Sequence, residues 1–166
     1  MDDFKADPRL VIKFTDSSEG GKNIQLRSGS SLWGLVDIIP TGNNEGDCKT
    51  KGQTGETWAV QMAFINEMRA SGWGPFLYDI AMEWVTARGG RIMSDRRSVS
   101  SDAKGVWDFY LNRRDDVKSA QLDSKHKPFI TPNDKSDDCL QRSFLGKYYS
   151  KKDWDKFMEY PDDEER

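Results

Sequence analysis

The fold is decided by residues 56–90, which read ETWAVQMAFINEMRASGWGPFLYDIAMEWVTARGG. The start of this stretch alternates large apolar side chains with smaller ones, which is the period of a half-buried strand. The large side chains are Trp58, Val60, Met62 and Phe64. Because the positions between them are small rather than charged, the pattern predicts a strand that is covered on both sides and leaves room for a ligand to approach one of them.

A helix is predicted directly after this strand, over residues 75–88. Apolar residues recur there at positions i, i+3, i+4, i+7 and i+8, which places them on one helical face. They are Leu77, Ile80, Ala81, Trp84 and Val85. Pro75 is favoured in the first turn, where its missing N–H is not needed, and Gly89 followed by Gly90 predicts the C-terminal stop.

The loop between strand and helix contains Gly72 and Gly74. Backbone amides at the start of a helix point outward and the helix dipole adds partial positive charge, so such a loop suits phosphates. Glycine also lets the backbone come close to a ligand. The dinucleotide fingerprint does not fit because it needs three spaced glycines, and the P-loop does not fit because Pro75 stands where lysine is required.

The flanking segments predict further strands and one more helix. Two strands, residues 10–14 and 24–27, are joined by a glycine turn, and a third apolar stretch covers residues 32–39. The polar segment 41–55 predicts a loop. A short strand over residues 91–94 follows the central helix.

The second helix is predicted after a capping run at residues 98–101, with Ala103, Val106, Trp107, Tyr110 and Leu111 at helical spacing. Beyond residue 113 the pattern weakens, and a strand is expected near residues 129–130. Residues 153–166 hold seven acids against two bases, which predicts a short helix and an acidic tail. We therefore expect a single domain over residues 1–152 and the tail after it.

Composition excludes several classes of function. With 25 Lys and Arg against 28 Asp and Glu, the net charge of −3 disfavours a nucleic-acid binder. No apolar run approaches the roughly 18 residues of a membrane helix, and the acidic start does not resemble a signal peptide, so we expect a cytoplasmic protein. Two distant cysteines and one histidine, His126, predict no metal site and disfavour histidine-dependent hydrolases.

The loop motif Arg69-x-x-Gly72-x-Gly74 resembles the acetyl-CoA loop of the GNAT acyltransferases, Gln/Arg-x-x-Gly-x-Gly/Ala between the fourth strand and the next helix. The resemblance covers residues 56–111. It implies an α/β (α+β) domain with a mixed, mostly antiparallel central sheet flanked by helices on both faces. The segment from Ser98 to Arg113 also resembles uncharacterised GNAT-like proteins of tailed phages.

By this resemblance, acetyl-CoA is the co-substrate. The backbone amides that would bind its pyrophosphate belong to Arg69, Ala70, Ser71, Gly72, Trp73 and Gly74. The main chain that would pair with the pantetheine arm and polarise the thioester belongs to Met62, Ala63 and Phe64. Glu56 stands where some members keep a glutamate base. Trp107 occupies the usual place of a tyrosine acid, so Tyr110, one turn away, becomes the candidate acid.

Each assignment has a plain structural alternative: a surface acid for Glu56, a core aromatic for Tyr110 and an ordinary turn for residues 69–74. The predicted function is direct transfer of acetyl from acetyl-CoA to a primary amine of an unknown acceptor, a small molecule or a protein. One alternative is a catalytically inactive, phage-encoded structural or interaction protein in the host cytoplasm or virion, forming oligomers or complexes through Trp73, Trp107 and residues 115–140. Another is a transferase acting on a nucleic-acid base, which the acidic balance disfavours.

Overall fold

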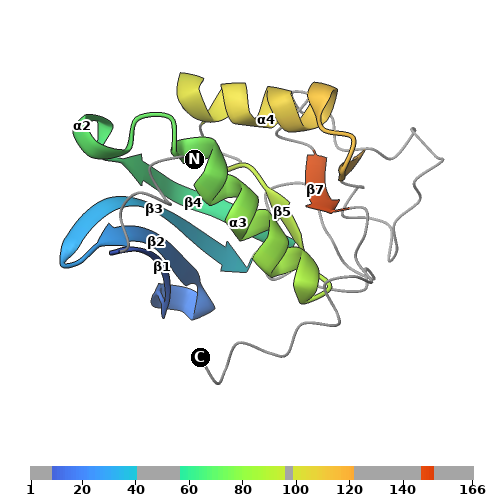
Figure 1. The fold of residues 1–166 in the computed structure, drawn as a ribbon. Coiled ribbons are helices and arrows are strands. Elements are labelled where there is room, and N and C mark those ends of the chain that lie inside the picture. The colour runs from blue at the N-terminus through green and yellow to red at the C-terminus, as the bar shows by residue number, and fades with distance from the viewer. Residues whose placement is uncertain (1–8, 41–56, 96–98, 122–146, 152–166) are drawn as a thin grey trace.

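The computed structural model describes residues 9–40, 57–95, 99–121 and 147–151 of the 166. These residues form an α+β arrangement with one seven-stranded mixed sheet (Figure 1). The strand order is β1-β2-β3-β4-β5-β7-β6. The pair β4 and β5 is parallel, and the other neighbouring pairs are antiparallel.

The strands are β1 (Leu10–Asp16), β2 (Lys22–Ser28), β3 (Ser31–Pro40), β4 (Thr57–Ile65), β5 (Arg91–Met93), β6 (Val117–Gln121) and β7 (Lys147–Lys151). The helical elements are the 3-10 turn η1 (Ser18–Gly20), α2 (Glu67–Ala70), α3 (Gly74–Ala87) and α4 (Ser101–Arg113). The predicted strands of the first half, the central helix, the short strand after it and the second helix are all confirmed. The sequence did not predict α2, β6 or β7, and the expectations for residues 41–55, 129–130 and 153–166 lie outside the described residues.

The predicted helix ends have the expected chemistry. At the end of α3, Gly89 takes a φ of +75°, and the amide of Gly90 donates to the carbonyl of Val85 at 2.7 Å. Both features belong to a Schellman stop. At the start of α4, the hydroxyl of Ser100 accepts from the amide of Ala103 at 3.2 Å, which is an N-cap.

Both long helices pack on the same face of the sheet. Helix α3 runs across β2, β3, β4, β5 and β7. Helix α4 packs beside α3 on this face. Its Trp107 stacks on Tyr149 of β7 and meets Tyr78 of α3 edge to face. The expectation of helices on both faces is therefore wrong for the described helices. The connections β4-α3-β5 and β5-α4-β6 move the same way across the sheet, and right-handed crossovers then place both helices on one side.

A buried lysine of β7 forms ion pairs with α3 and with the residue that precedes β6. The side chain of Lys151 is 6 % exposed, and its Nζ lies 3.3 Å from Asp79 of α3 and 2.9 Å from Asp116, the residue before β6. Arg114 bonds the same two carboxylates, with 3.0 Å to Asp79 and 2.6 Å to Asp116. We refer to Asp79, Arg114, Asp116 and Lys151 as the ion-pair network.

The ion-pair network predicts a loss of stability in acid. Hydrogen bonds from Arg114, supported by Lys151, hold the pKa of Asp116 well below its ordinary value. Because the folded-state pKa lies below the unfolded value near 3.9, the contribution of Asp116 is complete above about pH 5 and is lost as the pH falls through the folded-state pKa. Burial raises the pKa of Glu83, which acts in the opposite direction.

Urea unfolding measured in steps from about pH 6 to about pH 2 should therefore show a smaller acid-induced loss of unfolding free energy in Asp116→Asn than in the wild type. Glu83 is present in both proteins, and Asp116→Asn removes only the smallest of the causes that shift its pKa, so most of its effect is common to the two proteins. Equal pH slopes for the two proteins would contradict this role of Asp116.

Among the described residues, no helix combines the length and the apolar composition that crossing a membrane requires.

Candidate functional site

A bulge in β4 divides this strand into two halves. Asp37 of β3 is opposite Met62, whereas the next residue, Ile38, is opposite Val60, so Gln61 is an extra residue. A bulge of this kind reverses the faces of all later side chains. Trp58 and Val60 are buried against α3, but Met62 is 53 % and Phe64 47 % exposed. The prediction that these four side chains share one face is thus wrong beyond the bulge.

The same strand separates from its parallel neighbour. Pairing between β4 and β5 covers Thr57 to Ala59 on one side and Arg91 to Met93 on the other. Strand β5 ends there, while β4 continues to Ile65. From Val60 onward, this edge of β4 therefore has no described strand beside it. Backbone groups along such an edge can hydrogen-bond an extended ligand.

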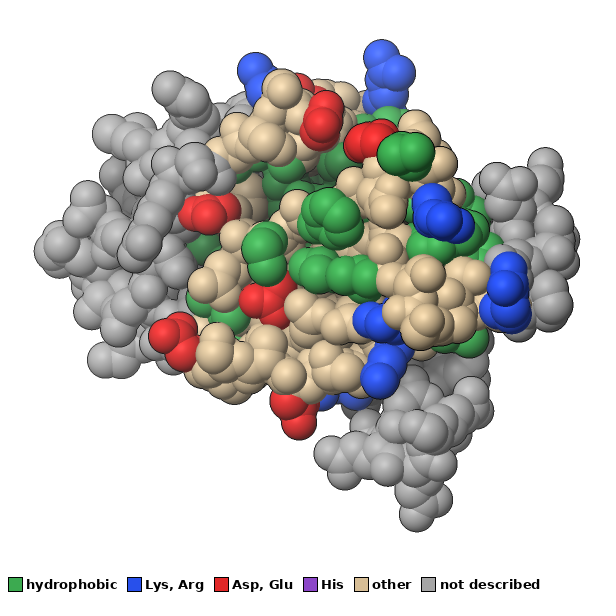
Figure 2. All heavy atoms as spheres, turned by 90° about the vertical axis from the view of Figure 1, so that its left-hand side faces the viewer, with side chains coloured by type: hydrophobic (Ala, Val, Ile, Leu, Met, Phe, Trp, Pro, Cys, Tyr) green, Lys and Arg blue, Asp and Glu red, His purple; other side chains and the backbone are tan. Residues whose placement is uncertain are grey.

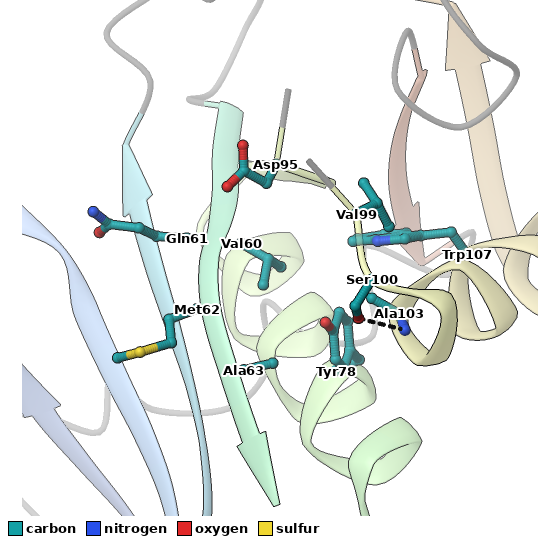
Figure 3. Close-up of a pocket in the computed structure, with 10 residues that line it drawn as sticks. All are labelled: Val60, Gln61, Met62, Ala63, Tyr78, Asp95, Val99, Ser100, Ala103 and Trp107. Carbon is teal, nitrogen blue, oxygen red and sulfur yellow. Dashed lines mark hydrogen bonds between the residues drawn. The ribbon is translucent and has the colours of Figure 1, made fainter. Parts of the chain in front are cut away.

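A cavity of about 240 Å³ lies along this open edge. Its walls come from β4, from α3, from the chain after β5 and from the start of α4. We call it the strand-edge cavity; it is lined by Val60, Gln61, Met62, Ala63, Tyr78, Asp95, Val99, Ser100, Ala103 and Trp107. In Figure 3, Val60 and Ala63 point toward the helices, whereas Gln61 and Met62 point to the opposite side of β4. The lining of the strand-edge cavity thus includes side chains from both sides of β4.

A second cavity, of about 360 Å³, continues from the first toward the glycine turn. The two share Ala63, Tyr78, Ser100 and Ala103. We call the second one the loop cavity; it is also lined by Ile65, Glu67, Gly72, Gly74, Pro75, Asp102 and Val106. Together they form a groove from the split of β4 and β5 to the N-terminus of α3.

The predicted phosphate loop is a short helix followed by a glycine turn. Asn66 caps α2, and the amides of Arg69, Ala70 and Trp73 already donate to carbonyls of the turn at 2.8–3.0 Å. Those three amides are occupied, so this part of the predicted phosphate contact does not hold in this conformation. Of the remaining predicted residues, Ser71 is the C-cap of α2, and Gly72 and Gly74 line the loop cavity.

Position 72 requires glycine because of its backbone conformation and not because a side chain would lack room. Its φ is +83°, a conformation that side chains disfavour, and a β-carbon there would meet nothing within 4 Å. The indole of Trp73 is turned inward, 6 % exposed, with its ring edge to face against Phe76. The bulky residue in the loop therefore does not obstruct the groove.

The candidate catalytic residues have different outcomes. Glu56 lies outside the described residues, so its role stays a prediction. Tyr110 is 2 % exposed, and its hydroxyl donates at 3.4 Å to the carbonyl of Pro75 and to Asp79. Burial, together with the nearby charge of Asp79, raises the pKa of Tyr110 above its ordinary value. Tyr110 lines neither cavity, so it belongs to the packing between α3 and α4.

Two residues that the sequence did not single out line the strand-edge cavity: Tyr78 and Asp95 (Figure 3). Tyr78 is 5 % exposed, and burial raises the pKa of Tyr78 to about 12. Asp95 is the carboxylate that lines the cavity, two residues after β5. A signal for Asp95 was available in the sequence, because side chains just beyond the end of a parallel strand often form a site.

Exposed apolar side chains lie on β4 and α2, two elements that border the groove. Besides Met62 and Phe64, the side chain of Met68 on α2 is 97 % exposed. Figure 2 shows apolar side chains in the middle of the face on which α2 and the end of β4 lie in Figure 1. By contrast, Trp73 and Trp107 are 6 % and 1 % exposed, so neither forms the predicted contact surface for a protein partner.

Comparison with known proteins adds no relative: no protein-family model, curated protein or solved structure matches this chain.

Proposed function

We propose that the protein is a GNAT-like N-acetyltransferase that transfers acetyl from acetyl-CoA directly to a primary amine. The observation that carries this proposal is the open edge of β4 where it separates from β5. This edge lies beside the strand-edge cavity, and the loop cavity continues to the N-terminus of α3. The two halves of the groove differ in chemistry as the two halves of CoA do.

The strand half of the groove suits the pantetheine arm. This arm is extended and contains amides, so it can pair with the main chain of an open strand edge as an added strand would. Met62 and Ala63 line this half, and the main chain continues to Phe64. Pairing with β3 along the other edge holds β4 in place, so the backbone N–H groups that face the open edge could polarise a thioester carbonyl without reorganising.

The helix half of the groove suits a pyrophosphate. Among the described turn and loop hydrogen bonds, none is donated by the backbone amide of Gly72 or Gly74. Both residues line the loop cavity at the start of α3, whose dipole favours negative charge. Arg69 in the last turn of α2 adds a full positive charge near the same end.

Acetyl-CoA supplies the activated acetyl group, and the residues of the chain supply position and proton transfer. An amine reaches the site as an ammonium ion and must lose a proton before it can attack. Asp95 lines the strand-edge cavity and can accept that proton, directly or through water. Glu56, one residue before β4, remains the predicted alternative base.

Thermal unfolding with and without acetyl-CoA tests the proposal. A ligand at 100 times its dissociation constant adds about 2.7 kcal/mol, which for a chain of this size raises the melting temperature by roughly 5 to 10 °C. We expect this shift in the wild type and in desulfo-CoA titrations, and its loss in Gly72→Trp, because the indole would occupy the loop cavity.

Gly29→Trp is the matched control. Gly29 lies between β2 and β3 and has a φ of +57°, and a β-carbon there, like one at Gly72, would meet nothing within 4 Å. Both variants carry the same kind of backbone strain, but only one lies in the groove. A shift retained in Gly72→Trp would contradict the phosphate loop, and no shift in the wild type at millimolar acetyl-CoA would contradict the proposed function.

A further inference from the structure

The outer edge of β1 has no described strand beside it. Strand β1 lies at one end of the sheet, and among the described strands it pairs with β2 alone (Figure 1). Edge strands are usually protected from further pairing by proline, bulges or inward-pointing charges. Strand β1 contains no proline, and its pairing with β2 runs from Leu10 to Asp16 without a shift in register. This edge is therefore regular enough to accept another strand.

The hydrogen-bond pattern shows which residues of β1 face the open edge. The amide of Gly29 donates to the carbonyl of Arg9 at 3.4 Å, and these two residues extend the register of β1 with β2 by one position. In an antiparallel pair, hydrogen-bonded positions alternate with positions that are not hydrogen-bonded. The odd-numbered residues therefore bond toward β2, and the backbone N–H and C=O groups of Leu10, Ile12 and Phe14 point outward.

The side chains along this edge are apolar and partly exposed. Phe14 is opposite Ile24, a residue that is 0 % exposed beneath the helices, yet Phe14 itself is 40 % exposed. Val11 lies on the other face of the strand and is 48 % exposed. A regular edge strand that exposes apolar side chains is a template for pairing with another chain.

We propose that a second copy of the chain binds this edge, with β1 antiparallel to β1 about a two-fold axis at Ile12. An isologous contact of this kind uses the same surface on both copies. Leu10 then lies opposite Phe14 of the partner subunit, and Ile12 lies opposite Ile12 of the partner subunit. These apolar residues are the ones whose N–H and C=O groups point outward, so they meet as hydrogen-bonded pairs. The two sheets become one continuous sheet.

Charge selects this axis from its neighbours. An axis at Lys13 would place Lys13 opposite itself, and an axis at Val11 would place Arg9 opposite Lys13. Like charges directly opposite each other destabilise a strand pair. The axis at Ile12 instead places Lys13 opposite Val11, whose exposed side chain the aliphatic part of the lysine covers. An axis further along the strand would shorten the overlap.

Sedimentation of a dilution series from micromolar to millimolar protein tests the proposal. One strand from each copy makes a small interface, so we expect the wild type to pass from monomer to dimer within this range. Phe14→Lys should raise the Kd of the dimer at least about 100-fold, because a charge then lies opposite Leu10 twice in each dimer. Phe109→Lys is the matched control: Phe109 lies on α4 and is 43 % exposed, so the same charge is added at similar exposure. Its Kd should equal that of the wild type.

A cysteine cross-link tests the position of the axis, in a background with Cys48→Ser and Cys139→Ser. Hydrogen-bonded residues opposite each other have Cα atoms about 5.5 Å apart, which is within the range of a disulfide. Ile12→Cys should therefore give a covalent dimer on oxidation. Lys13→Cys is the control, because the two copies of this position would be diagonal neighbours about 7–8 Å apart, beyond that range.

The outcomes decide between this surface and others. A wild type that stays monomeric throughout the series would leave the edge to a strand of a different protein and overturn the proposal. A dimer with the same Kd in Phe14→Lys and Phe109→Lys would overturn it as well. Cross-linking of Lys13→Cys in place of Ile12→Cys would overturn the axis at Ile12. The residues of β1 line neither cavity, so the thermal shift with acetyl-CoA should be the same in Phe14→Lys as in the wild type.

Discussion

Replacing Trp107 by alanine should lower the free energy of unfolding by about 3–5 kcal/mol, the range for a large aromatic removed from a core. Trp107 is 1 % exposed and touches three other rings. It stacks on Tyr149 at 5.1 Å and meets Tyr78 and Tyr110 at 5.6 and 6.0 Å. Its loss would leave a cavity where α3, α4 and β7 meet, and three aromatic neighbours cannot all move in to fill it.

Chemical unfolding followed by circular dichroism measures this loss, and the melting temperature should fall by roughly 10 °C or more. Phe109→Ala is the matched control, because Phe109 lies on the same helix and is 43 % exposed. We expect the control to change the unfolding free energy by no more than about 0.5 kcal/mol. Similar losses in the two variants would mean that α4 does not pack through Trp107.

Replacing Lys151 by methionine should lower the free energy of unfolding by about 3 kcal/mol, near the lower end of the range for breaking a buried charge pair. The change leaves Asp79 and Asp116 without the lysine that lies 3.3 and 2.9 Å from them. Arg114 still neutralises part of their charge, since it bonds both carboxylates. For this reason we do not expect the upper end of the range.

The measurement is again chemical unfolding at neutral pH, with Lys22→Met as the matched control. Lys22 pairs with Asp16, whose side chain is 89 % exposed, and exposed pairs contribute about 0–1 kcal/mol. A loss in Lys151→Met no larger than that of the control would show that the ion-pair network adds little to the folded state. Restoration by Lys151→Arg would support charge rather than shape as the cause.

Local elements were predictable because their signals are local. The spacing of Leu77, Ala81 and Val85 defines a helix wherever it is placed, and the glycine pair after it supplies a stop that depends only on backbone conformation. Ser100 caps α4 through a bond to an amide three residues away. Strands β6 and β7 carry no comparable signal, since their short segments are polar and pair with residues about 30 positions apart.

The face of a side chain was predictable only as far as the first irregularity. Alternation assigns Met62 and Phe64 to the side of Trp58, and a single extra residue, Gln61, moves them to the other. A bulge has no fixed sequence signature, because it depends on how two strands pair. The same bulge helps to open the edge of β4 on which the proposed site depends.

The surroundings of Tyr78 and Tyr110 show the same limit of sequence-based prediction. Helical spacing places Tyr78 beside the predicted apolar face of α3 and Tyr110 on the apolar face of α4, and neither position reveals what the hydroxyl meets. The strand, the glycine turn and the helix of residues 56–90 follow from propensities and caps that act within a few residues. The groove exists because β5 ends while β4 continues, and because α4 packs beside α3. Such contacts between distant segments arise only when the whole chain is folded.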